Sequence, residues 1–502
     1  MIGIATIVVI AAPALAILMM LVVPRPALAE LLNLLSSFLA FGAALVIVVL
    51  APAQGALFFD RYIIVDPLGA WVILCAAIVY LLASIYARGY MRTLDEDERL
   101  PRFYQLFALF ALTIFAAPLM NNPGVYWIAI EMTTVVSTFL VAFEQAPESI
   151  EAGWKYIIIV SAGITLALLG TVLFYWAGTF SLGPTYQMTW ATLRHAAPHM
   201  NHTLLILSFL LVLVGFGTKV GLAPMHTWLP DAHSEGPAPV SAMLSGALLN
   251  AAMAGIVRYM TVLHRAALFT FPDQLLVVFG VTSLVVAALF IIRPRGVKRL
   301  MAYSSVEHMG IIAIGFGFGG PLGVAGAMYH MLNHSLNKSL MFFGAGNAMR
   351  SYGTKSMSRI RAFGAQFPVS GALWLAGAIA ITGAPPFGLF ASEITILRAG
   401  FDGIGVWAAI IMAILLIVIF IGFLNHFRQM YFEPTDPDAP PPKPTSKWSI
   451  VPMWLALVPL LVFGLWWPRA LWRDFQVVEH NIGAVSVTPS PAQARLGLRL
   501  PR

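Results

Sequence analysis

Residues 215–250 read GFGTKVGLAPMHTWLPDAHSEGPAPVSAMLSGALLN, and they place a lysine, Lys219, at the end of a long apolar segment. A charged side chain deep in such a segment is costly, so by default it marks an ion or proton path. Four prolines follow and predict that the helix breaks there: Pro224, Pro230, Pro237 and Pro239. Non-helical backbone at membrane depth is tolerated only where it is buried in protein or lines a wet cavity. A lysine beside a broken helix is typical of a transporter site.

The composition of the whole chain is that of a membrane protein. Of its 502 residues, 59% are hydrophobic and only 10% are charged, and the mean hydropathy is +0.84. A soluble protein carries about a quarter charged residues. The single cysteine, Cys75, excludes an intrachain disulfide and an all-cysteine cluster. The net charge of +7 does not indicate nucleic-acid binding, because the basic residues lie in short loops between apolar segments.

The apolar segments predict an all-α polytopic fold with about fourteen transmembrane helices. A span needs roughly 20 mostly apolar residues. The segments that meet this rule are 2–23, 27–53, 67–87, 103–121, 124–143, 155–178, 203–223, 238–262, 272–292, 298–318, 322–348, 366–397, 403–427 and 449–468. Ala27-Leu28-Ala29 resembles a signal-peptidase site, but no positively charged stretch precedes the first segment, which we expect to remain as a helix.

Lysine and arginine counts in the loops predict the orientation. Loops after odd-numbered spans hold 17 of these residues, whereas loops after even-numbered spans hold five. Because basic loops stay in the cytoplasm, we expect the chain in the cell (inner) membrane with both termini on the non-cytoplasmic side. The C-terminal tail adds five arginines on the opposite side, although tail charges count for less than loop charges.

Two of the segments break in a similar way. The seventh breaks at Gly-Leu-Ala-Pro (221–224) beside Lys219, and the twelfth breaks at Gly-Ala-Pro-Pro (383–386) beside Glu393. Five spans separate the breaks, so two five-helix repeats would be inverted relative to each other, as in many transporters. The expected units are 1–102 for three helices and a loop, 103–262 and 263–430 for the repeats, and 431–502 for the last loop, helix 14 and the tail.

Glu131, in the middle of YWIAIEMTTVV (126–136), is the predicted partner of Lys219. Burial disfavours a charged lysine and a nearby carboxylate favours it, so a change in their separation would bind or release a proton. One alternative is a carboxyl kept neutral by burial or hydrogen-bonded to Thr134. Another alternative is a lysine that extends to the membrane surface. The apolar residues before Lys219 and the proline break after it disfavour this alternative.

The eleventh segment contains YHMLNHSLNKSLMFF (329–343), with His330, His334 and Lys338 at positions i, i+4 and i+8. This spacing puts all three on one helical face, and histidine can relay protons near neutral pH. Histidines bonded to helix neighbours are one alternative. Haem or metal ligation is another alternative. It is disfavoured because a lysine lies one turn on and because the sequence shows no second histidine helix of matching depth.

Further polar residues have more open roles. Glu307 and His308 in RLMAYSSVEHMG (299–310) would line the path or bond to a neighbouring helix, and Glu393 is a candidate exit group. The loop residues His226, Asp231, His233 and Glu235 are expected chiefly to hold the broken helix together, with direct chemistry as the alternative. We expect a solvated loop rather than a metal cluster at His195, His199 and His202. No metal or cofactor site is predicted, and no G-x-x-x-x-G-K motif for nucleotide hydrolysis is present.

These motifs resemble those of the antiporter-like subunits of respiratory complex I and of multisubunit cation/proton antiporters. The resemblance covers roughly residues 60–430 and is strongest from 210 to 400. The motifs that carry it are KVGLAPMHTWLPDAH (219–233), KRLMAYSSVEHMG (298–310) and H-x3-H-x3-K (330–338). EHMG (307–310), APPFGLFASE (384–393) and NHSLNKSL (333–340) are most similar to component F of hydrogenase-4 and formate hydrogenlyase-type complexes.

The resemblance implies fourteen helices, inverted five-helix repeats and a proton channel through each half. It implies that Glu131 and Lys219 are the family's glutamate–lysine pair and that Glu393 is its terminal acidic group. The central relay would be His330, His334 and Lys338. Asn250 departs from the pattern, because many complex I members carry a lysine there. A path through this position would have to pass by water.

We therefore expect a proton-translocating, or alternatively sodium-exchanging, membrane subunit of an energy-converting redox complex. The chain would hold no redox cofactor of its own. Its partners would be other membrane subunits, membrane lipid and a peripheral arm of the nickel–iron hydrogenase-like or formate-oxidising kind. One alternative is a subunit of a Na+/H+ antiporter or inorganic-carbon uptake complex. Another is a structural membrane anchor for a peripheral enzyme.

Replacing Lys219 with alanine tests whether its charge matters. We expect Lys219→Ala to abolish coupled proton movement in membrane vesicles while the complex still assembles, because the variant loses the group that binds the proton. An anchor would tolerate the change, so full pumping by the assembled variant would contradict the mechanism.

Overall fold

The computed structural model describes residues 1–94, 97–294, 296–403, 405–434 and 441–483. Most of these residues are helical. Arg295 and three of the tail arginines, Arg495, Arg499 and Arg502, contributed to the predicted orientation and lie outside the described residues.

All fourteen predicted segments coincide with helices. The helices of the N-terminal half are α1 (Ile2–Val22), α2 (Pro26–Leu50), α3 (Pro67–Tyr90), α4 (Leu100–Leu119), α5 (Pro123–Val141), α6 (Pro147–Leu182), α8 (His202–Val220), α9 (Trp228–Glu235), α10 (Ala238–Met243), η4 (Leu244–Leu248) and α11 (Leu249–Arg265). In the C-terminal half they are α12 (Thr270–Ile291), α13 (Val297–Phe318), α14 (Gly320–Tyr352), α15 (Phe363–Gln366), α16 (Pro368–Ile381), α17 (Gly388–Asp402), α18 (Val406–Phe432) and α19 (Lys447–Leu465). Among the described residues, eleven helices are long and apolar enough to cross a membrane. The other three predicted segments coincide with α13, α14 and the pair α16 and α17.

Several helices begin where the sequence supplies a start signal. Helices α2, α3, α5, α6 and α16 have a proline in their first turn, where its missing N–H costs nothing and its fixed φ suits the helix. The Asp66 carboxylate accepts a hydrogen bond of 2.8 Å from the Gly69 N–H at the start of α3. Asn122 caps α5 in the same way through the Gly124 N–H. Such caps satisfy backbone donors that have no partner inside the helix.

Both predicted helix breaks are present. Helix α8 ends at Val220, and Gly221 follows in the left-handed region with φ +79°, a conformation that glycine adopts without strain. Helix α16 ends at Ile381, and Gly383 follows with φ +66°. The breaks contain the cis peptide bonds Ala223–Pro224 and Pro385–Pro386.

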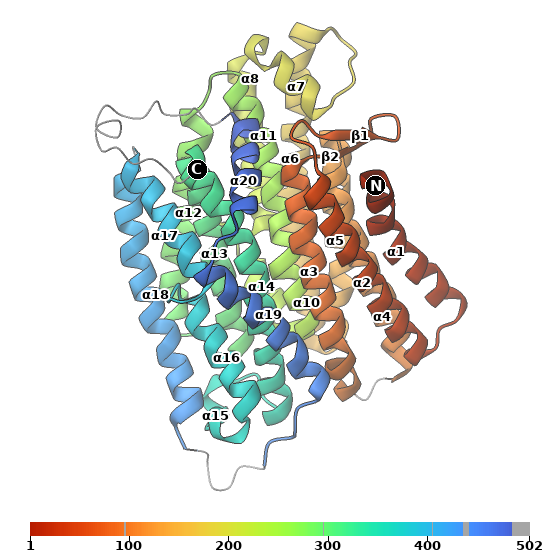
Figure 1. Cartoon of the computed structure of the whole chain (residues 1–502), viewed down its shortest axis with the longest axis vertical. Helices are drawn as coiled ribbons and strands as arrows, with labels where there is room; N and C mark the ends of the chain where they lie inside the picture. The colour runs from red at the N-terminus through yellow and green to blue at the C-terminus, as the bar shows by residue number, and fades with distance from the viewer. Residues whose placement is uncertain (95–96, 295, 404, 435–440, 484–502) are drawn as a thin grey trace.

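The two broken helices run in opposite directions. Helix α8 starts at the end of the bundle that carries α7, whereas α16 starts at the opposite end beside α15 (Figure 1). This is the relation that inverted repeats require. The division of the chain into units at residues 102, 262 and 430 stays a prediction.

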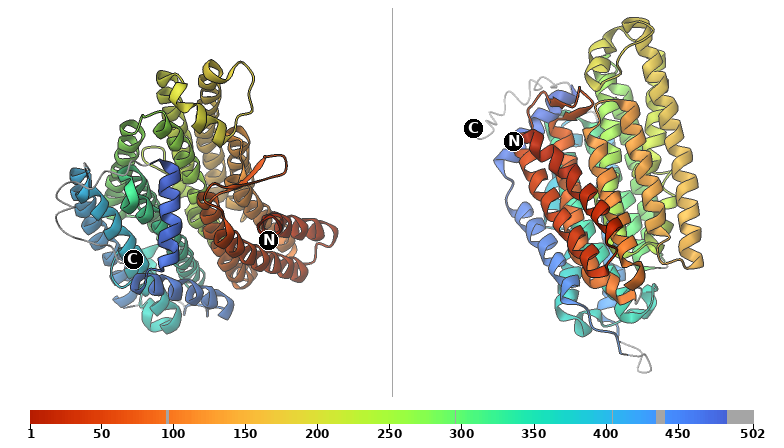
Figure 2. Two further views of the ribbon diagram at one scale, coloured as in Figure 1. Left: turned by 45° about the horizontal axis from the view of Figure 1, so that its top comes forward. Right: turned by 90° about the vertical axis from the view of Figure 1, so that its right-hand side faces the viewer.

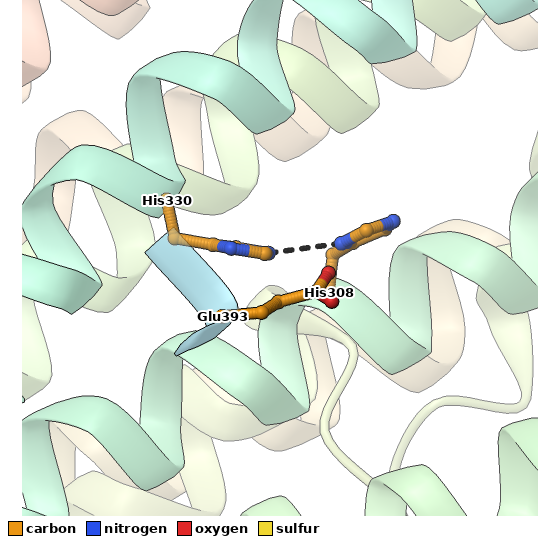
Figure 3. A group of neighbouring side chains, drawn as sticks. All are labelled: His308, His330 and Glu393. Carbon is orange, nitrogen blue, oxygen red and sulfur yellow. Dashed lines mark hydrogen bonds between the residues drawn. The ribbon is translucent and has the colours of Figure 1, made fainter. Parts of the chain in front are cut away.

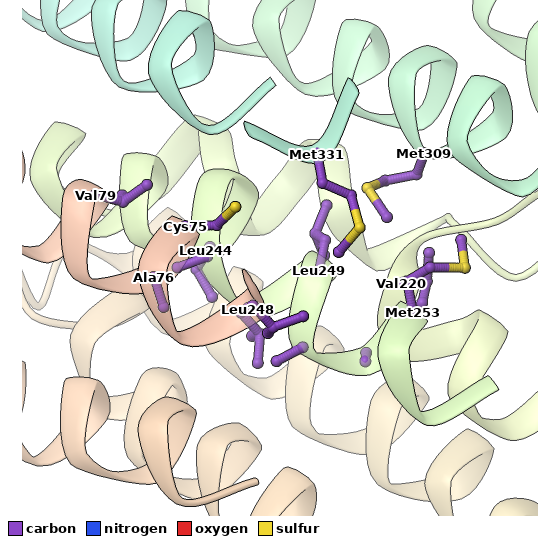
Figure 4. Packing of buried hydrophobic residues seen from close by; sticks show 14 of the residues in the cluster. Cys75, Ala76, Val79, Val220, Leu244, Leu248, Leu249, Met253, Met309 and Met331 are labelled. Carbon is purple, nitrogen blue, oxygen red and sulfur yellow. The ribbon is translucent and has the colours of Figure 1, made fainter. Parts of the chain in front are cut away.

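The centre of the bundle is formed by α3, α11 and α14, whose side chains are almost all buried. Leu and Met side chains of η4, α11, α13 and α14 pack together there near Cys75 of α3 (Figure 4). Outer helices such as α1, α2 and α18 instead expose many large apolar side chains. An apolar outer surface suits lipid, and polar groups can then be kept in the interior of the bundle.

Some elements lie in stretches that we expected as loops or tail. They include the hairpin of β1 (Ala56–Phe58) and β2 (Ile63–Val65), α7 (Trp190–Ala196), α9, α15 and α20 (Arg469–Ile482). Helix α20 is too short to span, but its apolar residues Phe475, Val478 and Ile482 recur on one face and are buried. It lies at one end of the bundle between the N-terminal helices and the second half (Figure 2).

Candidate functional site

The first polar cluster joins Glu131 on α5 to Lys219 on α8. The Lys219 ammonium donates a hydrogen bond of 2.8 Å to the Thr134 hydroxyl, and this hydroxyl lies 3.3 Å from the Glu131 carboxylate. Ser161 of α6 donates to the other Glu131 oxygen at 2.6 Å. No direct ion pair links the two charged groups among the described contacts, so Thr134 is the bridge between them. Lys219 is fully buried, whereas Glu131 is half-buried.

The second hydrogen bond of Lys219 leads toward α9. Its ammonium donates to the Tyr156 hydroxyl at 2.8 Å, and Tyr156 shares a hydrogen bond of 2.7 Å with Ser137. The Tyr156 ring packs against Trp228, the first residue of α9, with centroids 4.8 Å apart. Trp228 in turn donates to the Thr218 carbonyl at 2.7 Å. The break in the seventh span therefore holds the start of α9 beside the lysine.

His233 lies near the other end of α9 and is fully buried. Both of its ring nitrogens lack a hydrogen-bond partner within the described ranges. The ring stacks on Phe342 of α14 at 4.9 Å, and it is within electrostatic range of Lys338 and Lys298. Buried polar atoms are nearly always hydrogen-bonded to protein or ordered water. His233 thus lies where α9 meets α14 of the second half, with both ring nitrogens open to a partner.

Ion pairs link α9 to the second half of the chain. Asp231 pairs with Arg299 at 2.6 Å and Glu235 pairs with Lys355 at 2.5 Å. Asp231 is accordingly an ion-pair residue at the edge of the bundle, 3.7 Å from Lys155. His226 lies near the start of α9 with a buried Nδ1 that has no partner among the described atoms.

Asn250 lies at the centre of the bundle on α11. Its amide group donates to Ser335 at 3.0 Å, to the Gly246 carbonyl at 3.2 Å and to the Met331 carbonyl at 3.3 Å. Its carbonyl oxygen is buried and unpartnered among the described groups. The amide therefore binds α11 to α14 while one acceptor stays open, which is compatible with a water at this position.

The polar stripe of α14 faces α13. His330, His334 and Lys338 all lie on this helix at the spacing that puts them on one face, and all three are fully buried. Lys338 donates to the Ser304 hydroxyl at 2.5 Å and to the Met301 carbonyl at 3.3 Å. His334 approaches the Ser245 carbonyl at 3.2 Å. Glu307, also buried, lies on α13 close enough for its charge to act on Lys338.

His308 lies on α13 opposite His330, and the two rings share a hydrogen bond of 2.9 Å between Nδ1 and Nε2 (Figure 3). The other ring nitrogen of His330 shares a hydrogen bond of 2.9 Å with Ser392 of α17. The Glu393 carboxylate points toward both histidines, and its Oε1 is buried with no partner among the described atoms. These contacts bring the histidines of α13 and α14 to the break in the twelfth span.

This cluster corrects one sequence argument. We disfavoured metal ligation because no second histidine helix of matching depth was visible, yet His308 lies at the depth of His330. Ligand atoms of His308, His330 and Glu393 all lie within 4.8 Å of one another. The facing nitrogens already share a proton in the hydrogen bond, so the same geometry suits proton transfer between the rings.

The structure thus gathers most of the predicted site residues into two clusters, one around Lys219 and one around His308 and His330, with His233 and Asn250 between them. It also adds hydroxyl groups that the sequence analysis did not select. These are Tyr156, Ser161, Ser304 and Ser392. Buried hydroxyls are common in membrane helices, so no sequence signal marks them. His195, His199 and His202 are exposed.

A buried lysine, a histidine stripe and two broken helices in a polytopic bundle define an ion-transport class of membrane subunit. The family model described as "NADH:quinone oxidoreductase/Mrp antiporter, TM" matches residues 121–421. A hydrogenase-4 component F homolog of Methylacidiphilum infernorum is 37% identical over 378 residues, which cover 74% of this chain and 78% of the relative. Hydrogenase-4 component B of Escherichia coli is 31% identical over 349 residues, which cover 67% of this chain and 50% of that relative.

Solved structures share the fold. One chain of the archaeal membrane-bound sulfane sulfur reductase has a TM-score of 0.85 at 22% identity, covering 96% of this chain and 98% of its own. One chain of the Mrp complex from Dietzia sp. has a TM-score of 0.84 at 18% identity, covering 98% and 99%. The chain belongs to the NADH:quinone oxidoreductase/Mrp antiporter membrane family. It is an antiporter-like membrane subunit related to hydrogenase-4 component F, of the kind that serves proton translocation within a complex.

The Thr134 bridge has a testable energetic role. Thr134→Val keeps the shape of the side chain but removes a partner of both Lys219 and Glu131. Loss of a buried hydrogen bond to a charged group costs about 1.5–3 kcal/mol, so we expect a lower thermal unfolding temperature for the purified complex. Thr138→Val is the matched control, because the Thr138 hydroxyl donates only to the Thr134 carbonyl of its own helix. Equal effects of the two changes would contradict the bridge.

Proposed function

We propose that this chain conducts protons along a buried polar path from Glu131 to Glu393, as a membrane subunit of a hydrogenase-4-like energy-converting redox complex. The observation that carries the proposal is the position of His233. This fully buried histidine has two unpartnered ring nitrogens and lies between the Lys219 cluster and the α14 stripe. The roles of all the residues in this path are part of the proposal.

In the first half, Lys219 is the proton-binding group. In a low-dielectric interior its charge depends on nearby partners, because desolvation disfavours the ammonium and a carboxylate favours it. Thr134 transmits the position of Glu131 to Lys219 through hydrogen bonds of 2.8 and 3.3 Å. A movement of α5 against α8 would lengthen this bridge and favour release of the Lys219 proton.

Between the halves, Asn250 stands where many complex I members carry a lysine. The path therefore runs along α9 instead. The Tyr156 and Trp228 rings connect Lys219 with the first turn of α9, and His233 lies further along the same helix. Tryptophan carries no transferable proton here, so waters beside His233 and the open carbonyl of Asn250 complete the link. The ion pairs of Asp231 and Glu235 keep α9 against the second half.

In the second half, the proton passes along side chains that face each other across α13 and α14. The rings of His308 and His334 have centroids 5.4 Å apart, and those of His308 and His330 lie 5.1 Å apart. Glu307 would balance the charge of Lys338. Glu393 is the terminal acceptor, and it lies beside the break where Pro385 and Pro386 are exposed. The break would thus give Glu393 access to the outside of the bundle.

The relatives rather than the site support a redox arm as the driving partner. A hydrogenase-4 component F homolog and hydrogenase-4 component B are both similar to this chain in sequence, and the family model that matches it covers NADH:quinone oxidoreductase and Mrp antiporter subunits alike. We propose a peripheral nickel–iron hydrogenase-like or formate-oxidising arm. Its turnover would shift the helices around Glu131.

Replacing His233 tests the bridge. His233→Leu keeps the volume of the buried site roughly constant and removes the titratable ring, so we expect the rate of proton transfer through this chain to fall by about 10²-fold and the number of protons moved per electron to fall with it. Proton uptake by membrane vesicles, measured together with electron transfer, reports this ratio. Ser234→Ala is the matched control, because its hydroxyl donates only to the Pro230 carbonyl within α9. A normal ratio in assembled His233→Leu complex would remove His233 from the path.

Purification of the chain from its native membrane in mild detergent tests the partner. We expect nickel–iron and iron–sulfur subunits to co-purify, and mass spectrometry together with metal analysis would identify them. Purification with small membrane subunits alone, or with a soluble zinc protein, would contradict the redox arm and favour ion exchange or carbon uptake.

A further inference from the structure

Two neighbouring cavities lie under α20, at the end of the bundle where α3 and α7 begin. The first has a volume of about 50 Å3, and its polar lining consists of Gln54, Asp66, Arg194, Arg258, Thr261 and Asn481. We call it the basic cavity. The second has a volume of about 230 Å3, and we call it the apolar cavity. Ala53, Pro67 and Val478 line both, so the two cavities adjoin each other.

The basic cavity has more positive than negative charge. Arg258 binds the Asp66 carboxylate with hydrogen bonds of 2.6 and 2.9 Å and also donates to the Pro118 carbonyl at 3.0 Å. Its Nε remains without a partner among the described residues, although the side chain is only 3% exposed. Arg194 makes no hydrogen bond or ion pair to any described residue, and it is within electrostatic range of Arg258. One carboxylate thus faces two guanidinium groups.

The apolar cavity suits a hydrocarbon chain. Its walls are formed by residues of α2, α3, α14 and α20, among them Val48, Ala70, Trp71, Met328 and Val477. Asp474 is the one charged residue among the described lining residues, and it is exposed. An apolar cavity of this size next to a basic one is complementary in shape and polarity to an amphiphile with an anionic head.

Helix α20 covers both cavities. Phe475 packs edge-on against Trp71 with centroids 4.8 Å apart, and Asn481 donates to the Ala53 carbonyl at 2.7 Å. His264 of α11 lies 3.2 Å from the Ile482 carbonyl. These contacts fix α20 across the boundary between the N-terminal helices and the second half (Figure 2). A ligand held beneath it would contact both parts of the chain.

We propose that these cavities bind one anionic phospholipid, with its phosphate between Arg194 and Arg258 and part of an acyl chain in the apolar cavity. Guanidinium groups bind phosphate through charge-assisted, often bidentate hydrogen bonds, and the whole head of Arg194 is available for them, with Arg258 adding its positive charge. The lipid would act as a structural bridge under α20. Free inorganic phosphate shares the head-group chemistry but would leave the apolar cavity unfilled.

Photolabelling of the purified complex tests the site. The probe is phosphatidylglycerol with a photoactivatable acyl chain, and peptide mass spectrometry identifies the labelled segments. We expect labelling of residues 469–482 or of α3, and competition by unlabelled phosphatidylglycerol but not by equimolar inorganic phosphate. Equal competition by phosphate would show a free-anion site and overturn the lipid assignment.

Variants of the chain separate head-group binding from general damage. Arg194 lies in a short surface helix, so Arg194→Ala should leave the fold intact and weaken labelling of this segment by about fivefold, the effect of one basic residue on an anionic lipid. Arg194→Lys should restore part of it. Arg25→Ala is the control, because Arg25 is an exposed arginine in the α1–α2 loop. Unchanged labelling in Arg194→Ala would overturn the proposal.

Discussion

A protonatable group inside a membrane protein has to receive its polar partners from the protein, because lipid offers none and bulk water is far away. Lys219 shows how this requirement shapes the fold. The two acceptors of its hydrogen bonds are Thr134 on α5 and Tyr156 on α6. The three side chains therefore have to lie at the same depth in the bundle, and α5, α6 and α8 have to be rotated so that these side chains face one another. Its position near the end of α8 also requires a break whose free backbone groups lie inside the bundle.

The same requirement explains why the two helix breaks lie where the charges are. A broken helix leaves carbonyl and N–H groups without intrahelical partners, and these groups, with the water they attract, are the natural surroundings of a proton site. Lys219 precedes the first break and Glu393 follows the second. Because α8 and α16 run in opposite directions, the chain reaches the two breaks from opposite ends of the bundle.

Between these sites, ion-paired residues and titratable residues without an ion pair lie in different parts of the bundle. The charged residues at the edge of the bundle, such as Asp231 and Glu235, are paired with cations and hold α9 in place. The histidines at the centre lack such partners, and several of their ring nitrogens are free among the described residues. Among the described residues, paired charges thus lie at the edge of the bundle, and titratable groups without an ion pair lie at its centre.

The sequence by itself located the apolar segments that coincide with the membrane helices, because a span needs a long apolar run, and it located the breaks from glycine and proline. It also placed His330, His334 and Lys338 on one face, since the helical period is a local property. The tertiary structure decided which groups meet across helices: Thr134 between Glu131 and Lys219, His308 against His330, His233 at the boundary between the halves, and α20 over two cavities. These contacts depend on the depth and rotation at which separate helices pack, and a single sequence carries no direct signal for either.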